Sequence, residues 1–417
     1  MTAVIGLLNK YGVAIAADSA VTVSGHNNRK IYNSANKIFT LSKYHPVGIA
    51  IYNNAQLMGV PWEIIIKEYR KQLEKRSFPR LVDYKDDFFY WLKVNNYFVH
   101  NNSNNYFSIE LVGFIQQRIS NYFEANNNLN IEINEEIFTD ILQQFITNNK
   151  KSKIDSLSDL PIGNLNNLVN AFLAEAIQFV DINYSFKINS PKCLDKLKEA
   201  FFVYFTHEYY LSQTGLIFTG YGETEIYPNV ITVNVSIVID GYLKYSLEQR
   251  KCASISDEKK SSILPFAQTD VIDTILRGIS PKLSYLTTQI FNGFIVNFKD
   301  EIKNLPGLPS ELKEILENIN INDYVMHFQQ SCEQKIKEEN VVPLMQTLAS
   351  LSKEDLAEMS ESLVYLTYLK RRFTMAEESV GGPVDVAVIT KGDGFIWIKR
   401  KHYFNPDLNR NFFNNYF

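Results

Sequence analysis

The chain opens with two short apolar runs, at residues 3–8 and 13–17, separated by the polar segment Asn9-Lys10-Tyr11-Gly12. A short polar break that contains glycine, placed between two apolar runs, predicts a β-hairpin. Both runs are apolar at nearly every position rather than at alternate ones, which is typical of strands covered on both faces. Further strands are predicted at residues 19–23, 37–41 and 47–52. The first fifty residues are therefore predicted to be nearly all sheet.

Helical spacing begins after Pro61, where Trp62, Ile65, Ile66 and Tyr69 recur on one helix face. From residue 76 to 213 the sequence becomes rich in Asn, Phe and Tyr. Helices are predicted in this part near residues 133–147, 164–180 and 192–209. Strands are predicted again at residues 215–219 and in the runs "NVITVNVSIVID" and "YLKYSLE", the last two joined by an Asp240-Gly241 turn. Residues 267–350 are predicted to be mainly helical.

The last clear helix begins at Ser352, a predicted N-cap with Asp355 three residues later. Its apolar stripe is Leu356, Met359, Leu363 and Leu366. The glycine pair Gly381-Gly382 is predicted to end this helix. Two strands, at residues 384–390 and 395–398, are predicted to follow as a hairpin.

Sheet segments at both ends and in the middle of the chain enclose two helix-rich stretches. Strands buried on both faces, together with helices, favour an α+β fold with four layers in the order α/β/β/α. The predicted core is discontinuous and the helical blocks are insertions in it. The predicted boundaries are 1–75, 213–250 and 355–400 for the core, 76–212 and 251–354 for the two insertions, and 401–417 for a tail.

The composition of the 417-residue chain limits the classes of function. A net charge of −4, with 45% hydrophobic and 21% charged residues, gives no reason to expect binding to nucleic acid or to a membrane. The basic clusters at residues 370–372 and 399–402 are predicted to be solvated ends of a helix and a strand. Three scattered cysteines and six scattered histidines indicate a reducing compartment, no disulfide framework and no metal site. No cofactor is predicted. The opening stretch has no basic segment before its apolar part, so a signal peptide is disfavoured and the cytoplasm is expected.

A threonine directly after the initiator methionine is the first candidate for chemistry. Removal of Met1 would place a free amine and a hydroxyl on Thr2. A hydroxyl nucleophile needs a base beside it, and an α-amine with an ordinary pKa of about 7.7–8.0 can accept the hydroxyl proton near neutral pH. A cation, a carboxylate that fixes the cation, and a backbone N–H for the oxyanion would complete the site. On the early strands, Lys37 and Asp18 can supply the first two.

The order of five motifs resembles the proteasome β-subunit branch of the N-terminal nucleophile (Ntn) hydrolases, including bacterial proteasome-like peptidases. The motifs are Thr2 after Met1, "GVAIAADSAVT", "NKIFTL", the strand that ends in "NNAQ", and "SVGGPVDVAVITKGDG". They cover residues 1–75 and 355–400, with a middle stretch near 213–250. The resemblance implies an Ntn-hydrolase sandwich and a threonine-type peptidase.

The resemblance also implies roles for individual residues. Thr2 falls at the nucleophile, Asp18 at the acid after the first strands and Lys37 at the catalytic lysine. Thr22 falls on the segment that pairs with the substrate backbone, and Gly381-Gly382 match the glycine pair before the penultimate strand.

Other positions depart from the family pattern. Ala50 stands where a glycine N–H normally binds both the oxyanion and the substrate. Glu377 stands for the supporting aspartate, and Val380 for the serine before the glycine pair, with Ser379 one place earlier. The family's Gly-Ser-Gly segment is absent, and "PFAQTD" (Gln268, Thr269, Asp270) stands in its place.

The resemblance implies a peptide or amide substrate, a homo-oligomer that restricts access to the site, and an ATP-dependent unfoldase as a partner. Two alternatives remain open from the sequence. In the first alternative to the peptidase, the chain is an Ntn amidase for a small molecule, with a pocket lined by the insertions. In the second, it is an inactive scaffold of the proteasome fold that binds partners. Hydrolysis of peptide and small-amide panels separates the two enzymes, and equal behaviour of wild type and Thr2→Ala identifies the scaffold.

Overall fold

The computed structural model describes residues 3–24, 29–95, 103–126, 132–150, 153–374 and 380–411. The chain is mixed α and β, in agreement with the predicted class. It divides into two compact units, which are described separately below. Unit 1 comprises Met1–Ala35 and Ala253–Phe417, and unit 2 comprises Asn36–Cys252.

Unit 1 is built on a five-stranded antiparallel sheet in the order β13-β1-β2-β14-β15. Its strands are β1 (Ala3–Asn9), β2 (Gly12–Ala17), β13 (Ser261–Ala267), β14 (Asp385–Thr390) and β15 (Gly394–Lys399). The predicted opening and closing hairpins are confirmed, and β2 joins them by pairing with β14. Strand β13 was not predicted, since residues 251–354 were expected to form a helical insertion.

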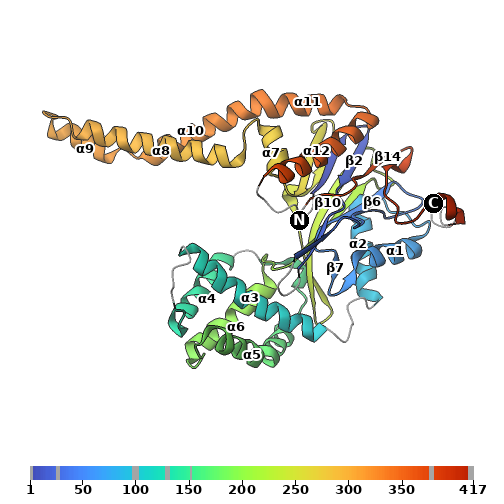
Figure 1. Ribbon diagram of the computed structural model, residues 1–417, viewed down its shortest axis with the longest axis horizontal. Helices are drawn as coiled ribbons and strands as arrows, with labels where there is room; N and C mark the ends of the chain where they lie inside the picture. The colour runs from blue at the N-terminus through green and yellow to red at the C-terminus, as the bar shows by residue number, and fades with distance from the viewer. Residues whose placement is uncertain are drawn as a thin grey trace. The chain divides into compact units, whose positions relative to one another are not determined.

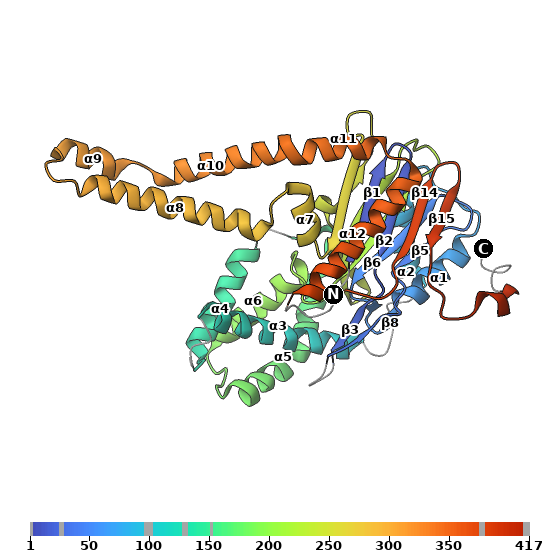
Figure 2. The same ribbon diagram turned by 45° about the horizontal axis from the view of Figure 1, so that its top comes forward.

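Helices cover one face of this sheet. Helix α12 (Lys353–Phe373) contacts β1, β2 and β14, and α11 (Val342–Ser350) contacts β1 and β13 (Figure 2). Alternate residues of β1, such as Ile5 and Leu7, join Leu363 and Val364 of α12 in one hydrophobic core. The residues between them, including Val4 and Leu8, are also buried. The non-alternating pattern of the opening runs therefore reflects a strand that is covered on both faces, as predicted.

Helix α12 begins as predicted, since the Ser352 hydroxyl accepts a hydrogen bond from the Asp355 N–H at 3.2 Å. The expectation for its end is wrong. The helix ends at Phe373 with Thr374 as its C-cap, eight residues before Gly381. The glycine pair therefore has another role, described below.

The remaining elements of unit 1 are a hairpin, a short strand and a run of helices. They are β3 (Val21–Ser24), β4 (Arg29–Tyr32), β12 (Ala253–Ser254), α7 (Asp270–Arg277), α8 (Pro281–Lys303), α9 (Ser310–Asn318), α10 (Ile321–Ile336), the π-helix η3 (Lys337–Val341) and the 3-10 helix η4 (Pro406–Leu408). Helices α8 and α10 lie side by side and extend away from the sheet of unit 1 (Figure 1). The helical character predicted for residues 267–350 is confirmed.

Unit 2 is built on a second antiparallel sheet, with its main strands in the order β11-β10-β9-β6-β5. These strands are β5 (Ile38–Thr40), β6 (Val47–Asn53), β9 (Thr214–Gly220), β10 (Asn229–Ile239) and β11 (Tyr242–Leu247), and a small hairpin is formed by β7 (Gln56–Leu57) and β8 (Val60–Pro61). The predicted turn between β10 and β11 is confirmed, because Asp240 and Gly241 have φ angles of 48° and 78°. Each predicted strand of this unit is present.

Two groups of helices belong to unit 2. The first, α1 (Trp62–Leu73) and α2 (Leu81–Val94), shares a core with the sheet through Trp62, Phe88 and Phe218. The second group is α3 (Ser103–Ala125), α4 (Glu135–Asn149), α5 (Ile162–Tyr184) and α6 (Pro191–Thr206), with the 3-10 helices η1 (Asp155–Leu157) and η2 (Gln249–Lys251) elsewhere in the unit. The second group has its own core, which also includes Ile237 and Ile239 of β10. The predicted α1, α4, α5 and α6 are confirmed, whereas α2 and α3 were not predicted.

Among the described residues, no helix combines the length and apolar character needed to cross a membrane. In the same part of the chain, no cluster of three or more His, Cys, Asp or Glu side chains is arranged to hold a metal ion.

Candidate active site

The predicted site residues fall into three groups. Thr2, Glu377 and Ser379 lie outside the described residues. Asp18 belongs to unit 1, where the backbone of Thr22 is part of β3. Lys37 and Ala50 belong to unit 2.

Asp18 is a buried carboxylate at the point where the chain leaves β2, and only 1% of its surface is exposed. One oxygen, Oδ1, accepts a hydrogen bond from the Ala3 N–H at 2.9 Å. The other, Oδ2, accepts hydrogen bonds from Ala20 N–H at 3.2 Å and from Gly381 N–H at 3.1 Å. The Asp18 N–H in turn donates to the Ala3 carbonyl at 3.1 Å. Asp18 therefore fixes the residue that directly follows Thr2.

The glycine pair holds the other side of this carboxylate. The Gly381 carbonyl accepts a hydrogen bond from the Ser19 N–H at 3.1 Å, and Ser19 Oγ donates to the Pro383 carbonyl. Gly382 has a φ of 76°, and a Cβ placed on it would lie 2.8 Å from Cβ of Asn33. Only glycine fits this position without a shift of Asn33. The pair therefore lets the segment before β14 pass close to Asp18 and Ser19.

Lys37 and Ala50 lie on neighbouring strands of unit 2. Lys37 directly precedes β5 and has 3% of its surface exposed, so it is not the solvated lysine that its sequence position alone would predict. Its carbonyl accepts a hydrogen bond from the Ile51 N–H at 2.8 Å. Ala50 lies in the middle of β6, opposite Ile38 on one side and Ile217 on the other. The backbone N–H groups of a strand with neighbours on both sides donate hydrogen bonds to those neighbouring strands. We therefore do not assign Ala50 as the oxyanion donor.

A different residue of the same strand has glycine-like backbone geometry. Asn53, the last residue of β6, has a φ of 66°. Asparagine is among the few residues that adopt this conformation readily. In the sequence, the Asn53-Asn54 pair at the end of an apolar strand is the feature that could have indicated this backbone conformation.

The segment "PFAQTD" forms the junction between β13 and α7. Ala267, the last residue of β13, pairs with Ala3 in the antiparallel register, so the junction follows directly from the strand position beside Ala3. Thr269 is the N-cap of α7 and Asp270 its first residue. The junction therefore lies in the same sheet, next to the start of β1.

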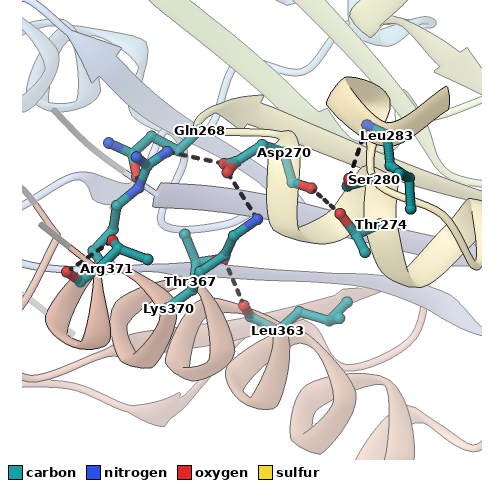
Figure 3. Close-up of polar contacts among 10 residues, drawn as sticks. Gln268, Asp270, Thr274, Ser280, Leu283, Leu363, Thr367, Lys370 and Arg371 are labelled. Atoms are coloured by element: carbon teal, nitrogen blue, oxygen red, sulfur yellow. Dashed lines mark hydrogen bonds and ion pairs between the residues drawn. The ribbon is translucent and has the colours of Figure 1, made fainter. Parts of the chain in front are cut away.

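Two basic residues of α12 bind this junction (Figure 3). Arg371 donates from Nε to Gln268 Oε1 at 2.8 Å and from Nη2 to Asp270 Oδ1 at 2.9 Å. Lys370 Nζ lies 3.0 Å from Asp270 Oδ2. Burial raises the pKa of Asp270, but the hydrogen bond from Lys370 and the charge of Arg371 outweigh it and hold the pKa below its usual value.

The expectation that both basic clusters are solvated ends is therefore wrong for Arg371 and Lys401, whose side chains are 21% and 12% exposed. Lys370 and Arg371 pair with Asp270, and Lys401 pairs with Asp385, whose side chain is only 4% exposed. Each acidic partner is distant in sequence or lies on another strand, so no local pattern could identify these pairs.

Comparison with known proteins adds two solved structures. No protein-family model matches the chain, and no curated protein matches it. The chain is similar to Anbu from Hyphomicrobium sp. strain MC1 over 99% of this chain and 94% of that chain, with 9% identity and a TM-score of 0.28. It is also similar to an Anbu (Gly-1) mutant from the same organism over 100% of this chain and 94% of that chain, with 9% identity and a TM-score of 0.27. A likeness at this level carries no argument about fold or function.

A cavity of about 860 Å³ opens in unit 1 between α7, α8 and α10. Arg277, Tyr285, Phe328 and Cys332 are among its lining residues. Of the predicted site residues that the structure describes, namely Asp18, Thr22, Lys37 and Ala50, none is among the residues that line it.

A second buried polar cluster lies in unit 2, around Lys244 of β11. Its Nζ donates to the carbonyls of Tyr204 and Tyr209, each at 2.6 Å, and lies over the rings of Tyr204 and Tyr210. The Tyr204 hydroxyl donates to Glu110. Burial lowers the pKa of Lys244 to about 7, and the charge of Glu110 opposes that effect. Burial also raises the pKa of Glu110 and of all three tyrosines.

This cluster gives a pH-dependent stability. Between about pH 7 and the ordinary lysine pKa, Lys244 is neutral in the folded chain and protonated in the unfolded chain, so unfolding takes up a proton. The stability of unit 2 should therefore rise from pH 7 to about pH 9.5, by up to about 1.4 kcal/mol per pH unit. Above pH 10 the raised tyrosine pKa values reverse the trend, because the unfolded chain then loses those protons first.

The measurement is the denaturant midpoint of unit 2 at a series of pH values. Lys244→Met should flatten the rise between pH 7 and 9.5, whereas Lys192→Met, at an exposed lysine of α6, should leave it unchanged. An equal slope in wild type and Lys244→Met would contradict the assignment.

Proposed function

We propose that the chain is a threonine-type Ntn hydrolase that cleaves an amide bond through an ester on Thr2, after Met1 has been removed. The observation that carries the proposal is the hydrogen bond from the Ala3 N–H to Asp18 at 2.9 Å. This bond fixes the backbone next to Thr2 to a buried carboxylate. A catalytic nucleophile needs such support, because it must be held in one geometry relative to the substrate. The carboxylate was assigned to the site from the sequence alone.

The proposed architecture is the four-layer Ntn-hydrolase sandwich, to which each unit would contribute one sheet and the helices that pack on it. The core would comprise residues 1–75, 213–250 and 355–400, together with strand β13, which pairs with β1, and helix α2, which shares a core with the sheet of unit 2. The helical parts of residues 76–212 and 251–354 outside these two elements would be insertions. The burial of both faces of β1 supports this arrangement.

Chain connectivity supports a role for Lys37. The Ala35 N–H donates to the Ser19 carbonyl at 3.1 Å, next to Asp18. Lys37 follows Ala35 by two residues, and two Cα–Cα steps span at most about 7.6 Å. A carboxylate accepts up to about four hydrogen bonds, so the three backbone donors of Asp18 do not exclude a lysine ammonium.

In the proposed reaction the Thr2 hydroxyl gives its proton to the α-amine and its oxygen attacks the amide carbon. The Lys37 ammonium favours the neutral form of the amine by its charge. The tetrahedral intermediate then breaks its C–N bond, and the leaving amine takes the proton from the α-ammonium. A water molecule attacks the resulting ester, its proton passes to the α-amine, and the carboxylic acid leaves as Thr2 regains its hydroxyl.

The nucleophile can be tested without knowing the substrate. We expect the intact mass of the protein to correspond to a chain that begins at Thr2, and a β-lactone probe to add its full mass there as an ester. Peptide mapping should locate the adduct on Thr2. Retention of Met1 throughout the folded protein, or an adduct elsewhere only, would overturn the proposal.

Panels of peptides and of small amides then test the substrate class. Turnover of peptides supports the peptidase, and turnover of small amides alone supports the amidase.

A further inference from the structure

Residues 281–341 of unit 1 form a projection that we call the helical arm. It consists of α8, α9, α10 and η3, with α8 and α10 side by side (Figures 1 and 2). Phe291 stacks on Phe328 at 4.1 Å between ring centroids, and Lys299 Nζ donates to the Ile319 carbonyl at 3.2 Å. No residue of α8, α9 or α10 is buried. Because helices in proteins gain most of their stability from tertiary packing, this arm lacks the support that a helix usually has.

Helix α8 has two faces with different surroundings. The face toward α10 carries residues of intermediate exposure, among them Thr288, Phe291 and Ile295. Another face carries an apolar stripe at helical spacing. The stripe is Leu283, Leu286, Ile290, Phe294 and Phe298, with exposures of 53%, 39%, 72%, 61% and 52%.

The absence of charged residues indicates that the stripe is an interaction surface. Residues 283–298 contain no Asp, Glu, Lys or Arg in sixteen consecutive positions. A helix face in contact with water normally carries charged side chains. Large exposed apolar patches on soluble proteins mark interaction sites.

We propose that the stripe of α8 is covered by the same stripe of a second copy of this chain, with the two α8 helices antiparallel. The proposal is independent of the proposed hydrolase function. An uncharged stripe offers no feature that would select a charged partner, whereas an apolar surface is complementary to its own copy.

The available area is sufficient for such a pair. The exposed parts of the five stripe residues amount to roughly 500 Å² in each copy, since large apolar side chains carry about 150–250 Å² each. Two copies would bury about 1,000 Å² before polar neighbours are counted, which reaches the size of a specific interface.

The charges at the ends of the stripe select the antiparallel orientation. Lys282 precedes the stripe, and Glu301 continues its spacing after Phe298. Both side chains are exposed, and neither forms an ion pair with any described residue. In an antiparallel pair centred on residue 292, Lys282 of each copy lies beside Glu301 of the other. A parallel pair would instead bring like charges together.

The same centre gives an isologous interface. Ile290 lies opposite Phe294 of the second copy, and Leu286 opposite Phe298. Gly293, beside the axis, has no atom within 4 Å of a Cβ built on it, so it leaves room for a second helix to approach. A two-fold interface of this type closes a dimer and does not propagate.

The test is the molar mass of the full-length protein by light scattering over a concentration series. We expect wild type to contain an even number of copies and Ile290→Glu/Phe294→Glu to halve that number, with an increase in Kd of at least 100-fold. Leu312→Glu, at an exposed apolar residue of α9 outside the stripe, should leave the mass unchanged. Circular dichroism must show equal helix content in the three proteins.

A charge exchange tests the orientation separately from folding. Lys282→Glu should weaken association by about 10-fold, and Lys282→Glu/Glu301→Lys should restore it. A monomeric wild type, or an unchanged mass in Ile290→Glu/Phe294→Glu, would overturn the proposal. Failure of the double exchange to restore association would overturn the antiparallel pairing.

Discussion

Thr2→Ala should lower the rate of labelling by the β-lactone probe by at least about 10³-fold, to the background of the reagent with other nucleophiles. The substitution removes the oxygen that attacks the amide, or the probe, in the first step of the proposed mechanism. It leaves a small residue after Met1, so removal of the methionine should be unaffected. Asp18 and Ala3 keep their hydrogen bond, so the fold should be unaffected as well.

The measurement is the time course of adduct formation by intact mass. Thr2→Ser is the matched control, because serine keeps the hydroxyl and the α-amine on one residue and should be labelled at a rate closer to that of wild type. Equal labelling of wild type and Thr2→Ala would remove the hydrolase proposal and favour the inactive scaffold.

Asp18→Ala should destabilise unit 1 by about 4 kcal/mol. The substitution leaves the N–H groups of Ala3, Ala20 and Gly381 without their acceptor, and each buried unsatisfied donor costs about 1–3 kcal/mol. For a unit of this size each kcal/mol lowers Tm by about 2–4 °C, so we expect a fall of roughly 10 °C. The same variant should lose labelling at Thr2, because the backbone next to the nucleophile is no longer fixed.

Two controls separate this effect from a general loss of charge. Asp18→Asn keeps one acceptor oxygen and should lose about half as much stability. Asp257→Ala, at an exposed side chain paired with Lys10 on the surface, should change stability by less than about 1 kcal/mol. A Tm of Asp18→Ala within 2 °C of wild type would contradict the role assigned to this carboxylate.

The sequence predicted those parts of the fold that depend on local patterns. The runs that form β1 and β2 are apolar at nearly every position, and the cap at Ser352 is a matter of four neighbouring residues. Strand β13 was missed because Pro265 lies within it. Proline is tolerated there because β13 is an edge strand with β1 on one side only.

Helix α2 was missed for a different reason. Most of its buried residues are aromatic, including Tyr84, Phe88 and Trp91, and they lie in the stretch predicted as a helical insertion, where no individual helix was assigned before residue 133. The rings of Phe88 and Trp91 pack on Tyr69 of α1, and Phe88 also packs on Phe218 of β9. These partners lie outside any short window of the sequence around α2.

The candidate site also contains residues that the sequence could identify and contacts that it could not. Asp18 could be identified because an acid directly after an apolar strand has a fixed position in the resembled family. The contact between Arg371 and Asp270 joins residues 101 positions apart, and it was invisible to any local argument. The helix end assigned to Gly381-Gly382 was wrong because a glycine pair signals close approach as well as termination, and here the approach is to Ser19 and Asn33.

The burial of Ala3, which has no exposed surface, affects how the protein should be handled. A polypeptide fused before Ala3 would have to reach the solvent from the start of a strand that is fully buried. It would also block the amine on which the proposed chemistry depends. At the opposite terminus Leu408 is 82% exposed, so a purification tag placed there avoids both problems. Preparations with the two tag positions should therefore be compared before a lack of activity is attributed to the protein.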